Sequence, residues 1–251
     1  MQVWPKGLSM RIADGVYVLP IPRGSQGADG FLNLTLILDE QNGATLVDTG
    51  LPGQAEAVGA ALAEAGIGVR EIRRIILTHQ DLDHIGSGAA LVRRSGARVL
   101  AHPADAPHID GSLRPLKPSP EMLERRPQMR EALERLEPVG VDERLDDGER
   151  LDIAGGTRVI FTPGHTPGHL SLYLERPKGL VAGDALTAEG GRLNGPNPPL
   201  TLDVDEAARS VRRLADLDVE TIVCYHGGVV GEDANGQLRR VLQEVSRGRD
   251  E

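Results

Sequence analysis

Four side chains that can bind metal ions lie within six residues of one another, between Thr78 and Gly86. They are His79, Asp81, Asp83 and His84. The apolar run Ile75–Leu77 comes just before them and indicates a buried strand. The imidazoles and carboxylates therefore stand at the tip of a strand, where a loop can surround a cation. Without a cation the neighbouring carboxylates would repel each other, so this stretch indicates a metal site.

Three more candidate ligands stand at the ends of other predicted strands. They are His165 in FTPGHTPGH, Asp184 in LVAGD and His226 in IVCYHGG. Any one of them alone would be interpreted as a turn or capping residue. Together with the first four they make seven nitrogen and oxygen ligands in four clusters, which is enough for two metal ions.

These motifs resemble those of the metallo-β-lactamase-fold hydrolases, and the resemblance covers most of the chain. That family carries an HxHxDH motif, a His in a TPGHTxGH-like run, an Asp in a GD step and a final His after a strand, in the order found here. The resemblance implies two divalent metal ions, each held by one of two sets of residues: His79, Asp81 and His165, and Asp83, His84 and His226. Asp184 would bridge the two ions.

Two other residues are expected to support these ligands without binding metal themselves. Asp48, in the step LVDTG, matches the family's Asp that holds the metal loop in place. His169 lies four residues after His165, but the prolines and the glycine around it argue against a helix. We therefore expect His169 to support the site by hydrogen bonding.

The chain departs from the family motif at Asp81, where the family has a second His. A carboxylate is a harder ligand than an imidazole, so the change moves the metal preference toward Mn²⁺ or Fe²⁺. Zinc remains the first choice, with manganese or iron as its rival. The short side chain of Asp81 leaves two alternatives open, direct ligation and contact through a water molecule.

Two cations that share a water molecule would lower its pKa and supply hydroxide near neutral pH. Asp83 is the expected catalytic residue, because it can ligate one metal and orient that water. The chain has no G-x-S-x-G sequence, so a serine mechanism finds no support. The prediction is a dinuclear metal-dependent hydrolase that uses a metal-bridging hydroxide on a carboxylic ester, lactone or thioester.

Three other functions stay open. A phosphodiesterase or nuclease would use the same metal site, although a net charge of −9 disfavours nucleic acid as a partner. Relatives of the fold that bind one iron perform sulfur dioxygenation with two His and one Asp. The last alternative is a degenerate metal-binding module in which Asp81 has abolished activity.

The composition suits one globular domain that spans residues 1–251. Hydrophobic residues make up 39% of the chain and charged residues 26%, the proportions of an ordinary globular protein. No apolar run approaches the ~20 residues that span a bilayer, and the N-terminal stretch lacks an apolar signal segment. Cys224 is the only cysteine, so no disulfide forms within the chain. We expect a cytoplasmic protein that acts on a small molecule and contacts no membrane.

The apolar pattern alternates between strands and helices. Strands are predicted at 15–19, 34–38, 44–47, 72–77 and 97–101. Helices are predicted at 54–65, from the end of the loop 78–86 to about residue 95, at 121–137 with a kink at Pro127, and after Asp203, which forms a capping-box-like pair with Glu206. The periodicity does not determine strand order. The resemblance implies an α/β fold, a four-layer αββα sandwich with the metal site at its edge.

Three segments are candidates for the wall of a pocket. Residues 21–30 are Gly-rich and form either a mobile flap or the tip of a long hairpin. Residues 190–199 are expected to hold no regular structure. The segment 103–141 carries apolar side chains that line a pocket, form the seam of a homodimer or pack in the core; these are Met122, Met129, Leu133 and Leu136.

Overall fold

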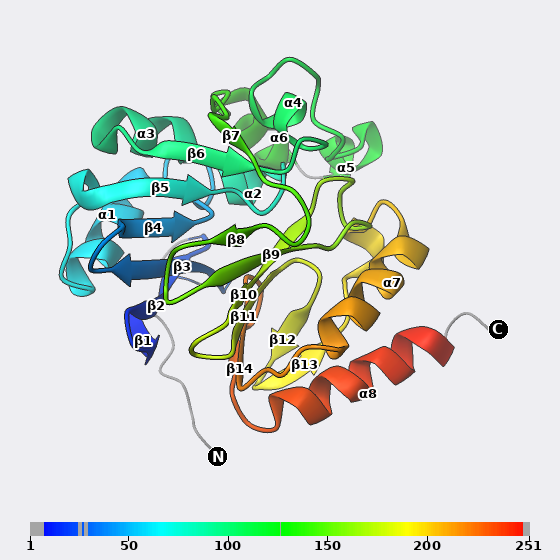
Figure 1. Cartoon of the computed structure of the whole chain (residues 1–251). Helices are drawn as coiled ribbons and strands as arrows, with labels where there is room; N and C mark the ends of the chain where they lie inside the picture. Colours follow the sequence, from blue (N-terminus) through cyan, green and yellow to red (C-terminus); the bar gives the residue numbers. More distant parts are fainter. Residues whose placement is uncertain (1–7, 25–26, 28–29, 126, 248–251) are drawn as a thin grey trace.

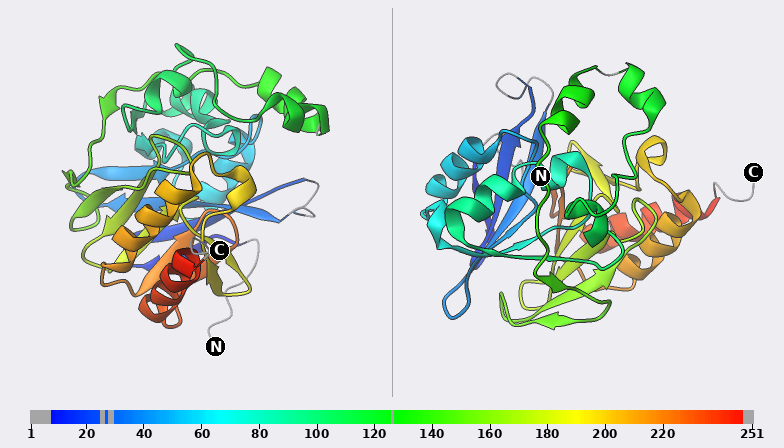
Figure 2. Two further views of the ribbon diagram at one scale, coloured as in Figure 1. Left: turned by 90° about the vertical axis from the view of Figure 1, so that its right-hand side faces the viewer. Right: turned by 90° about the horizontal axis from the view of Figure 1, so that it is seen from above.

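The computed structural model describes residues 8–24, 27, 30–125 and 127–247. Two large β-sheets pack face to face, and helices cover the outer face of each sheet (Figures 1 and 2). This is the αββα sandwich that the resemblance implied, and the expected fold class is confirmed.

The first sheet contains seven strands in the order β1-β2-β3-β4-β5-β6-β7. The strands up to β4 pair antiparallel, and those from β4 onward pair parallel. Their bounds are β1 (Met10–Ala13), β2 (Val16–Pro22), β3 (Phe31–Asp39), β4 (Gly43–Val47), β5 (Ile72–Ile76), β6 (Arg98–Ala101) and β7 (Glu143–Arg144). The predicted strands correspond to β2 to β6, whereas β1 and β7 are short edge strands that the pattern missed.

The second sheet contains six strands in the order β15-β14-β11-β10-β9-β8. All its pairs are antiparallel except β11 with β14, which are parallel. Their bounds are β8 (Arg150–Leu151), β9 (Thr157–Phe161), β10 (Leu170–Leu174), β11 (Gly179–Gly183), β14 (Thr221–Cys224) and β15 (Gly228–Val230). A separate hairpin consists of β12 (Thr187–Glu189) and β13 (Arg192–Asn194).

The helices fall into two outer layers and a cover over one edge. Helices α1 (Ala55–Glu64) and α3 (Gly88–Ser95) pack on the first sheet, and α7 (Val204–Ala215) and α8 (Ala234–Arg247) pack on the second (Figure 1). The shorter helices are α2 (Leu82–Ile85), α4 (Ala106–Ile109), α5 (Pro120–Arg125), α6 (Pro127–Glu134), η2 (Val69–Glu71) and η3 (Pro198–Leu200). The predicted cap of α7 is confirmed, because the Asp203 side chain accepts a hydrogen bond from Glu206 N–H.

Strands at the centre of the sandwich bury both faces. In β5, Ile75 packs toward the α1 and α3 layer, and its neighbour Ile76 packs between the two sheets against the cluster that contains Val159 and Leu172. Successive strand residues point to opposite faces. A strand covered on both sides therefore reads as a continuous apolar run, and the first polar residue after it marks where the strand leaves the core.

The ends of several strands meet at one edge of the sandwich. Asp48 follows β4, the Thr78–Asp83 loop follows β5, Asp184 follows β11 and His226 follows β14. A hydrogen bond from Leu170 N–H to the Thr78 carbonyl, 2.8 Å long, ties the start of β10 to the end of β5 and so joins the two sheets beside this edge.

One long segment leaves the sandwich and returns to the same place. Residues 110–138, which we call the 110–138 excursion, begin and end beside a hydrogen bond of 2.9 Å from Val139 N–H to the Ile109 carbonyl. The interruption predicted at Pro127 is confirmed, but the segment 121–137 contains two helices, α5 and α6, in place of one kinked helix, and α6 starts at Pro127. Proline lacks the N–H that a continuing helix needs and clashes with the preceding turn.

The structure also tests the predictions for residues 190–199 and for the described part of residues 21–30. Residues 190–199 were expected to be irregular, which is wrong: they contain β13 and the start of η3. Strands β2 and β3 pair as far as Pro22 and Phe31, so the Gly-rich segment connects a long hairpin. Residues 25, 26, 28 and 29 of that segment lie outside the described residues. Among the described residues, no helix is both long and apolar enough to cross a bilayer.

Candidate metal centre

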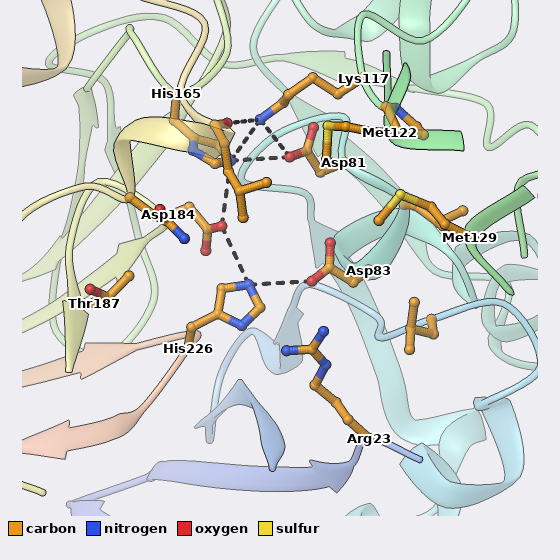
Figure 3. Close-up of a pocket in the computed structure, with 15 residues that line it drawn as sticks. Arg23, Asp81, Asp83, Lys117, Met122, Met129, His165, Asp184, Thr187 and His226 are labelled. Atoms are coloured by element: carbon orange, nitrogen blue, oxygen red, sulfur yellow. Dashed lines mark hydrogen bonds and ion pairs between the residues drawn. The ribbon is translucent and has the colours of Figure 1, made fainter. Parts of the chain in front are cut away.

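All seven predicted ligands lie together at the edge where the strand ends meet. One atom from each of His79, His165 and Asp184 lies within 4.8 Å of the others, and the same holds for Asp83, His84 and His226. We call these groups the first and the second triad. Asp184 connects them: its Oδ1 lies 3.4 Å from His84 Nε2, and its Oδ2 lies 3.4 Å from both His165 Nε2 and His226 Nε2 (Figure 3).

Several atoms that face this cluster are buried and have no hydrogen-bond partner among the described residues. They are His79 Nε2, Asp81 Oδ1, His84 Nε2 and Asp184 Oδ1. Buried polar atoms in folded proteins are almost always bonded, so a convergent group of unbonded ones requires an explanation. Imidazole nitrogens and carboxylate oxygens are the donors that Zn²⁺, Mn²⁺ and Fe²⁺ accept. The residues present therefore fit bound divalent cations.

Asp48 holds both ends of the Thr78–His84 segment by hydrogen bonding, in line with the supporting role that the resemblance implied. Its Oδ2 lies 2.9 Å from His84 Nδ1, and its Oδ1 accepts a hydrogen bond of 2.9 Å from Thr78 N–H. Asp48 has φ +63°, a left-handed conformation that costs free energy for a residue with a side chain. Because Asp48 engages Nδ1, the other ring nitrogen of His84 faces the centre.

His169 supports Asp184 by hydrogen bonding and contributes no atom to either triad. Its Nε2 accepts a hydrogen bond of 2.9 Å from Asp184 N–H, and its Nδ1 lies 2.8 Å from the Thr162 hydroxyl. Burial and the neighbouring His79 hold the pKa of His169 well below its usual value, which suits a neutral ring that accepts. At Gly183, where φ is +55°, a Cβ would lie 2.6 Å from this Nε2, so glycine is needed there.

The charges of the second triad favour a bound cation. Burial alone would raise the pKa of Asp83, but the hydrogen bond from His226 and the charges of His84 and His226 lower it to about 2. Burial alone would lower the pKa of His84, but the carboxylates of Asp48 and Asp184 raise it well above its usual value. The pKa of Asp184 is lowered as well, so the carboxylates of Asp83 and Asp184 are ionised at neutral pH and together attract positive charge.

Tyr225, next to His226, positions the loop that ends at Asp83. It is buried; its hydroxyl donates a hydrogen bond to the main-chain carbonyl of Asp83, and its ring centroid lies 3.7 Å from that of His84. Tyr225 therefore fixes the turn that carries Asp83 and His84, two members of the second triad.

Sequence reasoning missed Asp105, a fully buried carboxylate beside the centre. Its Oδ2 accepts from Gln80 N–H at 3.0 Å and from the Thr166 hydroxyl at 2.6 Å, and its Oδ1 accepts from Gly168 N–H at 2.7 Å. Asp105 thus joins the loop that carries His79 to the loop that carries His165. A carboxylate in a turn between two short elements gives no local signal of this role.

Sequence reasoning also missed Lys117, which reaches the first triad from the 110–138 excursion. Its Nζ lies 2.7 Å from Asp81 Oδ2, 2.9 Å from His165 Nε2 and 2.7 Å from the Leu200 carbonyl oxygen (Figure 3). Asp81 Oδ2 also lies 3.0 Å from His165 Nε2 and 3.5 Å from His79 Nε2. Asp81 therefore stands beside the first triad, paired with a lysine ammonium.

The two triads open into a pocket of about 300 Å³. Asp83, Asp184 and His226 line its polar side, and Met122 and Met129 lie across the pocket from Asp184 (Figure 3). The remaining lining is mixed and includes Arg23, Leu51, Leu82, Lys117, Asn197 and Leu200. Of the apolar residues predicted in the excursion, the two methionines line this pocket, and Leu136 packs against the α1 and α3 layer.

Comparison with known proteins places this arrangement in a family. Residues 28–226 match the family model of the metallo-β-lactamase superfamily. A metallo-β-lactamase family protein from Thermus thermophilus has a similar structure, with a TM-score of 0.72 and 28% identity over 96% of this chain and 81% of that one.

Curated relatives agree with this assignment. A probable metallo-hydrolase of Bacillus subtilis strain 168 is 28% identical over 96% of this chain and 90% of its own length. A hydroxyacylglutathione hydrolase of Pseudomonas aeruginosa strain LESB58 is 32% identical over 79% of this chain and 67% of its own length. The chain therefore belongs to the metallo-β-lactamase superfamily and is an enzyme of the hydrolase class.

Proposed function

We propose that this chain is a dinuclear metal-dependent hydrolase of a small carboxylic ester, lactone or thioester. The observation that supports the proposal is that two triads lie at the polar side of one pocket and that Asp184, a member of the first triad, also contacts the second. His79 and His165, with Asp81 directly or through water, would hold one divalent cation. The other would be held by His84, His226 and Asp83, and Asp184 would contact both. Zinc is the first choice of metal, with manganese or iron as its rival because of the carboxylate at Asp81.

When bound, two such cations would lower the pKa of a shared water and polarise the carbonyl that it attacks. The chain's own residues do the rest. Asp83 Oδ2 lies 3.3 Å from His226 Nε2 and faces the pocket, where it can accept a proton from water and orient it. Asp48 and His169 hold His84 and Asp184 in place, so the ligands need little reorganisation when a substrate enters.

The pocket lining supports a small substrate with both an apolar and a polar part. Met122, Met129 and Leu82 offer apolar surface, while Arg23 and Lys117 supply positive charge near the carboxylates. A volume of about 300 Å³ suits a small molecule and is too small for a folded partner. The resemblance to a hydroxyacylglutathione hydrolase, a protein named for action on a thioester, supports carbonyl substrates over phosphodiesters.

The test combines metal analysis with a substrate panel. Protein purified without added metal or chelator is analysed for its elements, and it is then assayed with p-nitrophenyl acetate, a lactone, a thioester and bis(p-nitrophenyl) phosphate. We expect close to two metals per chain and turnover of at least one carbonyl substrate. The Asp184→Asn variant should lose metal and activity together by about tenfold or more. Asp152→Asn, which changes an exposed carboxylate, is the matched control and should lose neither.

Each other result selects a different function. One iron per chain without hydrolysis would support a sulfur dioxygenase, and turnover of the phosphodiester alone would support a phosphodiesterase. Metal without any turnover would support a binding module. Metal content that is unchanged in Asp184→Asn would contradict the bridging role. Asp81→His should shift the preference toward zinc, and an unaltered preference would show that residue 81 is not a ligand.

A further inference from the structure

The Lys117 side chain is held in place on all sides. Only 11% of it is exposed, and its ammonium contacts Asp81, His165 and the Leu200 carbonyl at 2.7–2.9 Å. An ammonium carries three N–H donors and no acceptor. Because an ammonium can only donate, the contact with His165 is a hydrogen bond in the tautomer whose Nε2 presents its lone pair to Lys117; in the other tautomer Nε2 would donate to Asp81 Oδ2 at 3.0 Å.

That lone pair is the one a metal in the first triad would need. His165 Nε2 faces Asp184 Oδ2 at 3.4 Å, and a zinc ion bound to this nitrogen would lie about 2.0–2.1 Å from it. One lone pair cannot serve both an ammonium and a metal ion. The same ammonium engages Asp81, because Asp81 Oδ2 accepts from Lys117 Nζ at 2.7 Å.

The second triad has no such occupant. Among the described residues, Asp83 and His226 form ion pairs only within the cluster, and no lysine or arginine contacts His84. Arg23 lines the pocket but forms no ion pair with Asp83 in the part of the chain that the structure describes. Asp184 thus contacts both triads, and the triads differ in whether the side chain of a lysine or arginine contacts their ligand atoms.

We propose that the Lys117 ammonium is an internal cation that competes with the metal ion for the first triad. The second triad fills first, and the first triad fills only when Lys117 leaves Asp81 and His165. If Lys117 holds the site in about nine of ten molecules, the apparent affinity of the first triad falls by about tenfold. Lys117 lies in the 110–138 excursion, so it can move without disturbing a sheet strand.

The decisive experiment is a metal titration of the full-length protein after removal of metal with a chelator. Zn²⁺ and Mn²⁺ are titrated separately, with heat and bound metal per chain as the measurements. Lys117→Met keeps the length of the side chain and removes the charge. Lys178→Met is the matched control, since Lys178 is also ion-paired, to Asp218, but lies in a surface turn after β10. We expect wild type to bind one ion tightly and a second more weakly.

In Lys117→Met the second dissociation constant should fall by about tenfold or more, with the first changed by less than about threefold. Lys178→Met should match wild type in both constants. A second constant that is unchanged or weaker in Lys117→Met would overturn the proposal, because the ammonium would then be a bystander or a support of the site.

A second measurement needs no variant. The amines of the wild-type protein are acetylated briefly at zero, one and two equivalents of Zn²⁺, and the modified lysines are located by peptide mass spectrometry. Labelling of Lys117 should rise several-fold between the first and the second equivalent, while labelling of Lys178 stays constant. Constant protection of Lys117 with two ions bound would overturn the proposal.

This inference rests on the metal centre of the proposed function and not on its hydrolytic activity. A chain that binds no metal in either variant would refute both. A second constant that tightens in Lys117→Met without turnover of any substrate would support the inference and refute the proposed hydrolysis. Turnover with two metals bound, together with no effect of Lys117→Met on the second dissociation constant, would support the proposed hydrolysis and refute the inference.

Discussion

Replacement of Asp105 tests whether one buried carboxylate joins the two loops that carry the first triad. Asp105→Ala removes the acceptor of Gln80 N–H, Gly168 N–H and the Thr166 hydroxyl. A buried donor left without a partner costs about 1–3 kcal/mol. The hydroxyl can rotate to another partner, so the two N–H groups dominate, and the relief of a buried charge offsets part of their cost. We expect a net loss of about 3 kcal/mol in the free energy of unfolding.

The free energy of unfolding of Asp105→Asn should lie between those of wild type and Asp105→Ala. Its amide oxygen can take the place of Oδ2, which serves Gln80 and Thr166, while its NH₂ group then faces Gly168 N–H and cannot accept. The expected loss is about 1–2 kcal/mol. Asp152→Ala is the control, because Asp152 is exposed, and it should change the free energy of unfolding by less than about 0.5 kcal/mol.

The assay is urea unfolding followed by circular dichroism, in the presence of a chelator so that metal binding does not add to stability. The expected order of destabilisation is Asp105→Ala, then Asp105→Asn, then Asp152→Ala. If Asp105→Ala is no less stable than Asp152→Ala, the three hydrogen bonds do not hold the loops together and the reasoning is wrong.

Three further predictions concern other positions in the fold. Gly164→Ala should lower the free energy of unfolding by about 1–3 kcal/mol in urea titration, because φ is +126° and the new Cβ would lie 2.2 Å from the main-chain nitrogen of Ala207; equal stability would show that the loop yields. Burial raises the pKa of the Cys224 thiol far above its usual range, so iodoacetamide should modify it in urea but not in the native protein at pH 8, as read by mass spectrometry. Burial alone would raise the pKa of Asp147, but a main-chain N–H donor and the Arg213 guanidinium lower it below 3.8. Because the folded pKa is depressed, ionised Asp147 stabilises the fold above pH 3.8, and this stabilisation disappears as the pH falls through the lower folded pKa. Asp147→Asn should therefore have a lower free energy of unfolding than wild type above pH 3.8 and the same free energy in acid. A difference that persists in acid would contradict the role given to the Asp147 charge.

The ligand positions were accessible from the sequence because of how their strands are buried. Ile75 and Ile76 face opposite apolar layers, so the strand reads as an unbroken apolar run and His79 stands out just after it. The same holds for β11 before Asp184 and for β14 before His226. The order of the strands did not follow from this pattern, since pairing depends on contacts between distant segments; the resemblance to a family implied the sandwich architecture but no strand order.

The roles of Asp105 and Lys117 could not be predicted from the sequence, and the physical reason is the same for both. The partners of the Asp105 carboxylate are 25, 61 and 63 residues away, and the histidine that contacts Lys117 is 48 residues away. Neither residue lies in a periodic element, so its surroundings look like those of a solvated turn. Both roles exist only once the fold has brought separate loops together.

The 110–138 excursion leaves and rejoins the fold at one backbone hydrogen bond, and no ligand of either triad comes from it. Both sheets and all seven predicted ligands lie outside this segment. Yet it carries Lys117, Met122 and Met129 into the pocket. Mutation of the two methionines can therefore alter what enters the pocket without changing a ligand of either triad, whereas mutation of Lys117 in the same stretch reaches the first triad directly.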